Sequence, residues 1–211
     1  MTTSLDAILE RSAALHSELD ALWLRLESPE SNRGKVVVGY CAIVREHVIS
    51  QQHLFAIGHH VTALTLVRPT FESLVRSIWC LRGASDDWIE KFLTSPAMDA
   101  DPRKETHTGP PVDSMLETIQ RHHPEFVYRS LVELKEATWQ PMHSYVHGGI
   151  RPVVQALVGL PEPQQISAIR NGNGFAMFAT NVLLMNCEGP AGFLQPIQLR
   201  YDECLPPVSN C

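Results

Sequence analysis

Apolar side chains recur at three- and four-residue steps along most of the chain, the spacing of helices that bury one side. The clearest stripe lies in residues 4–27, where leucine, isoleucine and tryptophan recur at these steps and polar residues fill the positions between them. The strand-like pieces VVV at 36–38 and PVVQALV at 152–158 fit better as helix. Besides 4–27, the pattern predicts helices over 35–55, 59–82, 86–93, 112–123, 124–139 and 164–187.

Capping and breaking residues locate the helix ends. Ser85 and Asp113 are predicted to cap the helices that follow them, and Pro124 suits a first helical position. Gly83 suits the left-handed position that ends a helix. Residues 95–111 contain four prolines and alternating charges, which is typical of an exposed loop.

These elements predict an all-α fold. The helices form a single-domain bundle of six to eight helices over residues 1–188. Residues 189–211, rich in proline and glycine, are predicted to form a tail that packs loosely on the surface.

The helix predicted over 59–82 carries an unusual charge pattern, in the stretch RPTFESLVRSIW at 68–79. Arg68, Glu72 and Arg76 follow each other at four-residue spacing and supply all the formal charge between residues 60 and 81. The other sides are apolar or small, which predicts a central helix with a partly buried Arg–Glu ladder. Pro69 is predicted to kink this helix because it lacks the N–H that would bind the carbonyl of Thr65.

Burial changes the interpretation of the ladder. Exposed pairs at this spacing contribute only about 0.2–0.5 kcal/mol each, and desolvation can cancel the gain from a buried pair. Two arginines around one glutamate also leave an excess positive charge. We therefore expect Glu133 or Glu136, or a small anionic ligand, beside the ladder. Both an internal lock between helices and a ligand or catalytic pocket remain open.

The stretch WQPMHSYVHGG at 139–149 is the second candidate region. His143 and His147 are four residues apart, so a helix places them on one face, and Tyr145 accompanies them as a possible ligand contact. Histidine can serve as a general acid or base near neutral pH. The two histidines can equally have a structural role, in which their hydrogen bonds stabilise the end of a helix. Zinc needs three or four protein ligands and HExxH is missing, so the sequence predicts neither a metal nor another cofactor.

Composition excludes several classes of protein. The formal net charge is −6 and no basic stripe occurs, which argues against a dedicated DNA-binding protein but leaves room for a local basic pocket that holds RNA. No apolar run reaches the roughly 18 residues that span a membrane, and the N-terminus lacks the pattern of a signal peptide. Five cysteines without CxxC spacing favour a reducing, cytoplasmic location.

Two family resemblances bear on these regions. The Arg68-Pro69-x-x-Glu72 helix with the later SYVHG at 144–148 resembles a group of bacterial all-helical proteins of unknown function, over roughly residues 35–150. A looser resemblance is to HEPN-type helical bundles, many of which are metal-independent RNases of toxin–antitoxin and defence systems that use Arg-x(4–6)-His across a dimer. One literal match occurs, from Arg11 to His16. It lies on the first helix, whereas the motif of that family lies late in the bundle.

Two functional hypotheses follow. The first is a non-enzymatic helical module that forms a homodimer and binds a partner or small ligand. The second is an enzyme that cleaves phosphodiesters or modifies nucleotides, with Arg68 or Arg76 as anion clamp and His143 or His147 as general acid or base. The two hypotheses share one structural requirement, because both a pocket and an enzyme site need the histidines on the same side of the bundle as the ladder.

Overall fold

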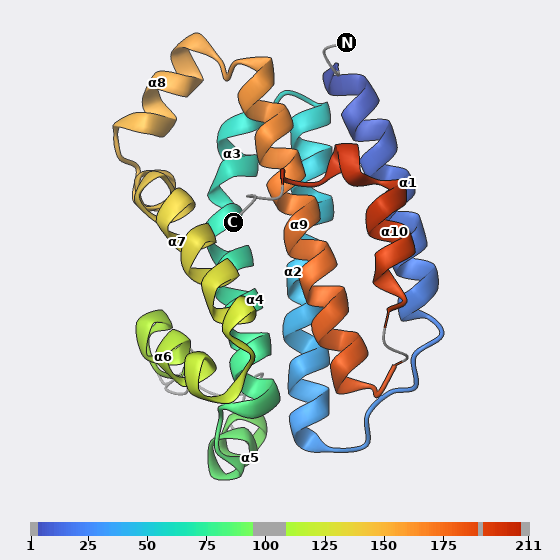
Figure 1. Ribbon diagram of the computed structural model, residues 1–211. Helices are drawn as coiled ribbons and strands as arrows, with labels where there is room; N and C mark the ends of the chain where they lie inside the picture. Colours follow the sequence, from blue (N-terminus) through green and yellow to red (C-terminus); the bar gives the residue numbers. More distant parts are fainter. Residues whose placement is uncertain (1–3, 95–108, 190–191, 208–211) are drawn as a thin grey trace.

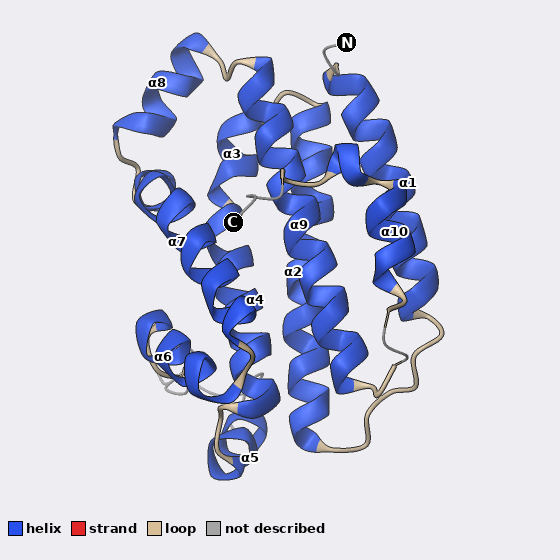
Figure 2. Cartoon of the chain, in the orientation of Figure 1, coloured by secondary structure: helices blue, strands red, loops and turns tan. Residues whose placement is uncertain are grey.

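The computed structural model describes residues 4–94, 109–189 and 192–207, and these contain ten α-helices and no strand (Figures 1 and 2). The predicted fold class is therefore confirmed, but the helix number of six to eight is too low. The helices are α1 (Leu5–Trp23), α2 (Asn32–Ala56), α3 (His60–Thr65), α4 (Val67–Arg82), α5 (Asp86–Thr94), α6 (Val112–His122), α7 (Glu125–Val146), α8 (Ile150–Val158), α9 (Glu162–Asn186) and α10 (Leu194–Arg200), followed by the short 3₁₀ helix η2 (Asp202–Cys204).

Three helices form the centre of the bundle. α4 packs on α2 and α9, and it also contacts α6 and α7. α1 and α10 lie on one side of the α2–α9 pair, while α6 and α7 cover α4 on the other side (Figure 1). The largest fully buried side chains include Phe55 of α2, Phe71 of α4 and Phe175 of α9. The central position that the sequence predicted for the ladder helix is thus observed.

The helix predicted over 59–82 is divided at Leu66. α3 ends at Thr65 and α4 begins at Val67, so the predicted kink appears as a break three residues before Pro69. Pro69 has no N–H to bond to the carbonyl of Thr65, and the helical ladder resumes with the bond from Thr70 N to Leu66 O. This division accounts for one of the additional helices.

Two predicted caps differ from the structure. α6 begins one residue before Asp113, because Pro111 already provides the extended N-cap backbone, and Asp113 instead pairs with Lys135 of α7. Gly83 does end α4, but its φ of −112° is not left-handed. A Cβ there would lie 2.8 Å from Cγ2 of Thr118. Glycine is needed at this position because α6 approaches closely, and not because of the backbone conformation. The Ser85 cap is confirmed by the bond from Trp88 N to Ser85 Oγ.

The segment after Gly189 is more ordered than the sequence predicted. It contains α10, and Tyr201, Cys204 and Leu205 are buried. Loose packing is therefore the wrong description for these residues, because their side chains enter the groove between α1 and α9 and α10 lies along α1 (Figure 1). Most of the predicted exposed loop, residues 95–108, lies outside the described residues. None of the described helices has both the length and the apolar content of a membrane-spanning helix.

Candidate functional site

Four predicted site residues meet where α4 faces the end of α7. Nε of Arg68 donates to Oε1 of Glu72 at 2.9 Å, and Nη1 of Arg68 lies 3.2 Å from Nδ1 of His143. The rings of His143 and His147 stand with their centroids 4.4 Å apart. Residues 75 positions apart in the chain thus form one group, which we call the Arg–His cluster: Arg68, Glu72, His143 and His147.

The contact between Arg68 and His143 defines the donor and acceptor roles that a hydrogen bond here requires. A guanidinium can only donate, so in such a bond Nδ1 of His143 is the acceptor. Glu72 binds the Nε edge of Arg68, which turns the terminal nitrogens of the guanidinium toward α7. The cluster therefore combines one oriented guanidinium, two imidazoles and one carboxylate.

A compact turn follows the two histidines and joins α7 to α8. Gly148 has a φ of +66°, which glycine adopts without strain. A Cβ on Gly149 would lie 2.5 Å from Oγ of Ser144, so a side chain does not fit there. The same Ser144 hydroxyl accepts a hydrogen bond from N of Arg151, at the start of α8. Ser144, Gly148 and Gly149 therefore set the angle between α7 and α8, a role that the sequence interpretation missed although the Gly-Gly pair marked it.

Arg76 lies at the other end of the ladder from Arg68. Eight residues at 1.5 Å each place it roughly 12 Å along α4 from Arg68. Its Nη1 lies 3.2 Å from the point where a Cβ on Gly109 would stand, and Trp88 borders the same point. The helix spacing kept the ladder on one side of α4, but different neighbours cover its two ends. A contribution of Arg76 to the same site stays a prediction.

Tyr145 also faces elsewhere. It is 7% exposed, and burial raises the pKa of its hydroxyl, which lies near Gln155 and Arg151 of α8. Because it is two residues from each histidine, it points to another side of α7. Glu133 and Glu136, the expected carboxylate neighbours of the ladder, are exposed on α7. Glu136 instead lines a groove between α6 and α7.

A second polar group with a histidine is sealed inside the bundle. It joins α1, α2 and α9 through Ser12, His16, Gln52 and Asn173, which are each at most 9% exposed. Nδ2 of Asn173 donates to Oγ of Ser12 at 2.8 Å and to the carbonyl of Cys204 at 2.9 Å. Its Oδ1 lies 3.0 Å from Nε2 of His16 and accepts from Nε2 of Gln52 at 2.8 Å. We call these four residues the buried polar network.

The buried polar network separates the two residues of the Arg-x(4–6)-His match. His16 points into the bundle, and burial lowers its pKa. Arg11 points outward, where it pairs with Glu203 at 2.7 Å and lies over the ring of Tyr201. The two side chains therefore belong to different environments within one chain. This arrangement gives no support to a catalytic pair at these positions.

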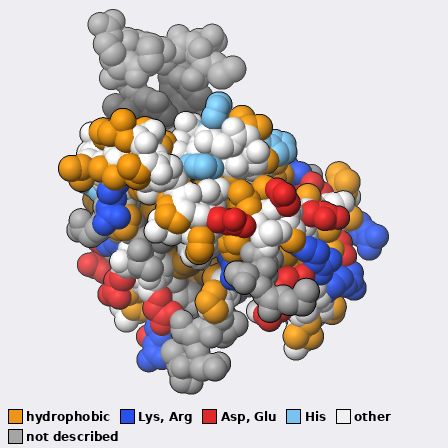
Figure 3. All heavy atoms as spheres, turned by 90° about the horizontal axis from the view of Figure 1, so that it is seen from above, with side chains coloured by type: hydrophobic (Ala, Val, Ile, Leu, Met, Phe, Trp, Pro, Cys, Tyr) orange, Lys and Arg blue, Asp and Glu red, His pale blue; other side chains and the backbone are white. Residues whose placement is uncertain are grey.

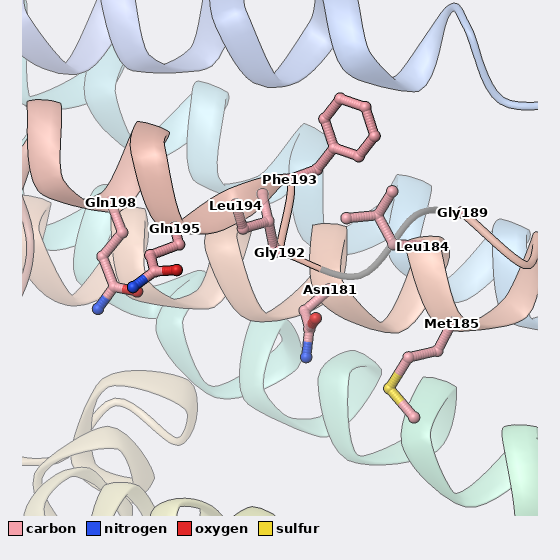
Figure 4. Close-up of a pocket in the computed structure, with 9 residues that line it drawn as sticks. All are labelled: Asn181, Leu184, Met185, Gly189, Gly192, Phe193, Leu194, Gln195 and Gln198. Atoms are coloured by element: carbon pink, nitrogen blue, oxygen red, sulfur yellow. The ribbon is translucent and has the colours of Figure 1, made fainter.

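Two cavities in the described residues lie away from the Arg–His cluster. The groove between α6 and α7, about 610 Å³, is lined by Asp113, Leu116, Glu117, Tyr128, Val132, Lys135 and Glu136. The other, about 350 Å³ and shown in Figure 4, is lined by Asn181, Leu184, Met185, Gly189, Gly192, Phe193, Leu194, Gln195 and Gln198, none of them charged. His143 and His147 are exposed, so the cluster is an open surface feature. Within the described residues, no three His, Cys, Asp or Glu side chains converge as a metal site would require.

The fold and the cluster define an all-α protein with an open Arg–His site between its central helix and α7. The chain belongs to DUF6988, a family of unknown function whose model matches residues 41–207. That match includes α4, α7 and α8, and it confirms the resemblance to a helical family of unknown function. No curated protein and no solved structure shows a significant match to the chain.

Proposed function

We propose that the protein is a non-enzymatic binding module that forms a homodimer and holds a small anion, such as a phosphate group, at the Arg–His cluster. The observation that carries this proposal is the 3.2 Å approach of Nη1 of Arg68 to Nδ1 of His143, with His147 beside it. Guanidinium groups bind phosphate oxygens through paired N–H donors, and imidazole adds a further donor. The Glu72 carboxylate repels an anion, so we expect approach from the side of His147.

The openness of the cluster supports binding over catalysis. Enzyme sites generally exclude water, which strengthens their electrostatic interactions. His143 and His147 are exposed, and neither described cavity contains them. An anion at such a site keeps part of its hydration shell, which suits reversible recognition of a phosphate group. We also propose a cytoplasmic location, because the thiols of Cys41 and Cys80 are free and buried and suit a reducing compartment.

The second candidate function is a metal-independent RNase or nucleotide-modifying enzyme. One observation favours it, namely that an arginine and a histidine stand in hydrogen-bonding distance at the surface. In that mechanism Arg68 would hold the phosphodiester and His147 or His143 would transfer the proton. A role in a defence or toxin–antitoxin system would then follow.

A phosphate titration tests the binding proposal. Heteronuclear NMR spectra are recorded while inorganic phosphate replaces sodium chloride at constant ionic strength, which removes general screening effects. We expect shifts confined to residues 68–72 and 143–149, lost in Arg68→Gln and weakened in His147→Gln. Arg129→Gln is the matched control, because it removes one positive charge from an exposed position on α7.

Two results would contradict the proposal. Equal shifts in chloride and phosphate, or shifts that survive Arg68→Gln, would show that the cluster is not an anion site. Incubation with single-stranded RNA and with ATP tests the enzymatic alternative in the same samples. Turnover that disappears in His147→Ala, with an unchanged melting temperature, would replace the binding module by an enzyme.

A further inference from the structure

The helix that follows the Arg–His cluster has its apolar side turned to solvent. On α8, Ile150, Val153, Val154, Leu157 and Val158 have exposed fractions between 46% and 80%. We call these five residues the α8 face. Of the fourteen exposed large hydrophobic residues in the described parts of the chain, five lie on this nine-residue helix. They form a contiguous patch, visible over α8 in Figure 3, and such patches mark interaction surfaces.

The side of α8 that packs on the protein is small. Pro152 is buried and Gln155 is partly buried, and both lie opposite the α8 face on the helix. The glycine turn and the bond from Arg151 N to Ser144 Oγ hold α8 in this orientation. The outward apolar side is thus built into the fold and is not the loose end of the chain.

The charges around the α8 face indicate what covers it. Arg151 is the only charged residue of α8. Binding to an anionic membrane surface needs several basic residues around the apolar side, and the net charge of −6 opposes it. A protein surface with its own apolar stripe and little charge is the better match, and the chain itself carries such a surface.

The α8 face is complementary to itself when two helices run antiparallel. Ile150 and Val158 lie four residues before and four residues after Val154. A two-fold axis at Val154 therefore pairs Ile150 with Val158 of the second copy. Arg151 would then lie near the C-terminal end of the other α8, whose last carbonyls carry negative partial charge. A parallel arrangement would bring the two Arg151 side chains together instead. Only the antiparallel pairing is complementary in both shape and charge.

We infer that the α8 face is the contact between two copies of this chain, with their α8 helices antiparallel about Val154. The inference rests on the homodimer of the proposed function and names its interface, but it does not depend on anion binding. A nine-residue helix is only roughly 13 Å long, and stable interfaces bury about 800 Å² on each partner. The dimer is therefore weak and depends on protein concentration.

Sedimentation equilibrium over a range of protein concentrations tests the inference. We expect the wild type to dimerise and Leu157→Glu to raise the dissociation constant at least about tenfold, because a carboxylate would be buried at the contact. Phe126→Glu is the matched control, since Phe126 is also exposed, at 65%, but lies at the start of α7. Melting curves confirm that both variants fold.

A cross-linking experiment tests the position of the axis. Val154→Cys should give covalent dimers with a short bis-maleimide, because the two cysteines would face each other across the axis. Leu24→Cys, exposed at the end of α1, should give no more product than the native cysteines of the wild type.

The outcomes separate the two proposals. A wild type that stays monomeric at every concentration overturns both this inference and the homodimer. Dimers that persist in Leu157→Glu, or fail to cross-link through Val154→Cys, overturn the α8 contact and leave the homodimer standing. The phosphate titration, repeated on Leu157→Glu, reports on the anion site alone.

Discussion

The buried polar network and the Arg–His cluster contain similar groups in opposite surroundings. Each joins distant helices through a histidine and a polar partner. His16 is 6% exposed and every bond of its network goes to other protein groups, whereas His143 and His147 are exposed to water. A buried polar group that loses its partner costs the full desolvation penalty, and an exposed one is satisfied by water. The network is thus expected to hold the fold together, and the cluster is available to a ligand.

The largest expected effect is the loss of the central amide of the buried polar network. Asn173→Ala removes the donor to Ser12 and Cys204, and it removes the amide oxygen that accepts from Gln52 and lies beside Nε2 of His16. We expect a loss of about 3 kcal/mol in the free energy of unfolding, measured by urea denaturation. Asn181→Ala on the same helix is the control and should stay within about 0.5 kcal/mol. Equal effects of the two substitutions would refute a special role for the network.

The second prediction concerns pH. Burial lowers the pKa of His16 below its ordinary value of 6.5, so the unfolded chain takes up a proton at a higher pH than the folded protein does. The contribution of His16 to the free energy of unfolding should therefore be constant above about pH 6.5 and should decrease as the pH falls below that value. His123 should also make the free energy of unfolding decrease as the pH falls, because burial and the nearby Arg82 lower its pKa as well.

Two variants isolate the contribution of His16 to this pH dependence. Urea denaturation at several pH values should show a shallower decrease for His16→Gln than for the wild type. Gln52→Leu should be less stable at every pH but keep the wild-type dependence, since it disturbs the same network without removing a titratable group. If His16→Gln keeps the full wild-type dependence, the buried imidazole does not contribute to it.

The smallest expected effect on stability is at the Arg–His cluster. The Arg68 and Glu72 side chains are 21% and 30% exposed, and pairs of this kind contribute only about 0.2–0.5 kcal/mol. Arg68→Gln should therefore lower the free energy of unfolding by no more than about 0.5 kcal/mol while removing phosphate binding. A loss comparable to that of Asn173→Ala would instead make the cluster a structural lock between α4 and α7.

The local pattern predicted much of the fold. Apolar spacing located the helices, and it placed Arg68 and Glu72 on one side of a central helix. The glycine pair after His147 is a local signal that could have located the turn between α7 and α8, since Gly148 adopts a positive φ there. The pattern was less reliable where neighbours decide the outcome. The helix predicted over 124–139 does not end there, because α7 continues through Pro141 to Val146.

The sequence by itself determined the all-α class, the position of most helices and the chemistry available in the ladder and in the histidine turn. Only the tertiary structure decided which of these groups meet. It joined Arg68 to His143, left Arg76 beside Gly109, buried His16 and turned the apolar side of α8 outward. Helix formation depends on residues within a few positions of each other. Burial and contact depend on segments that are far apart in the chain, and no local pattern specifies those.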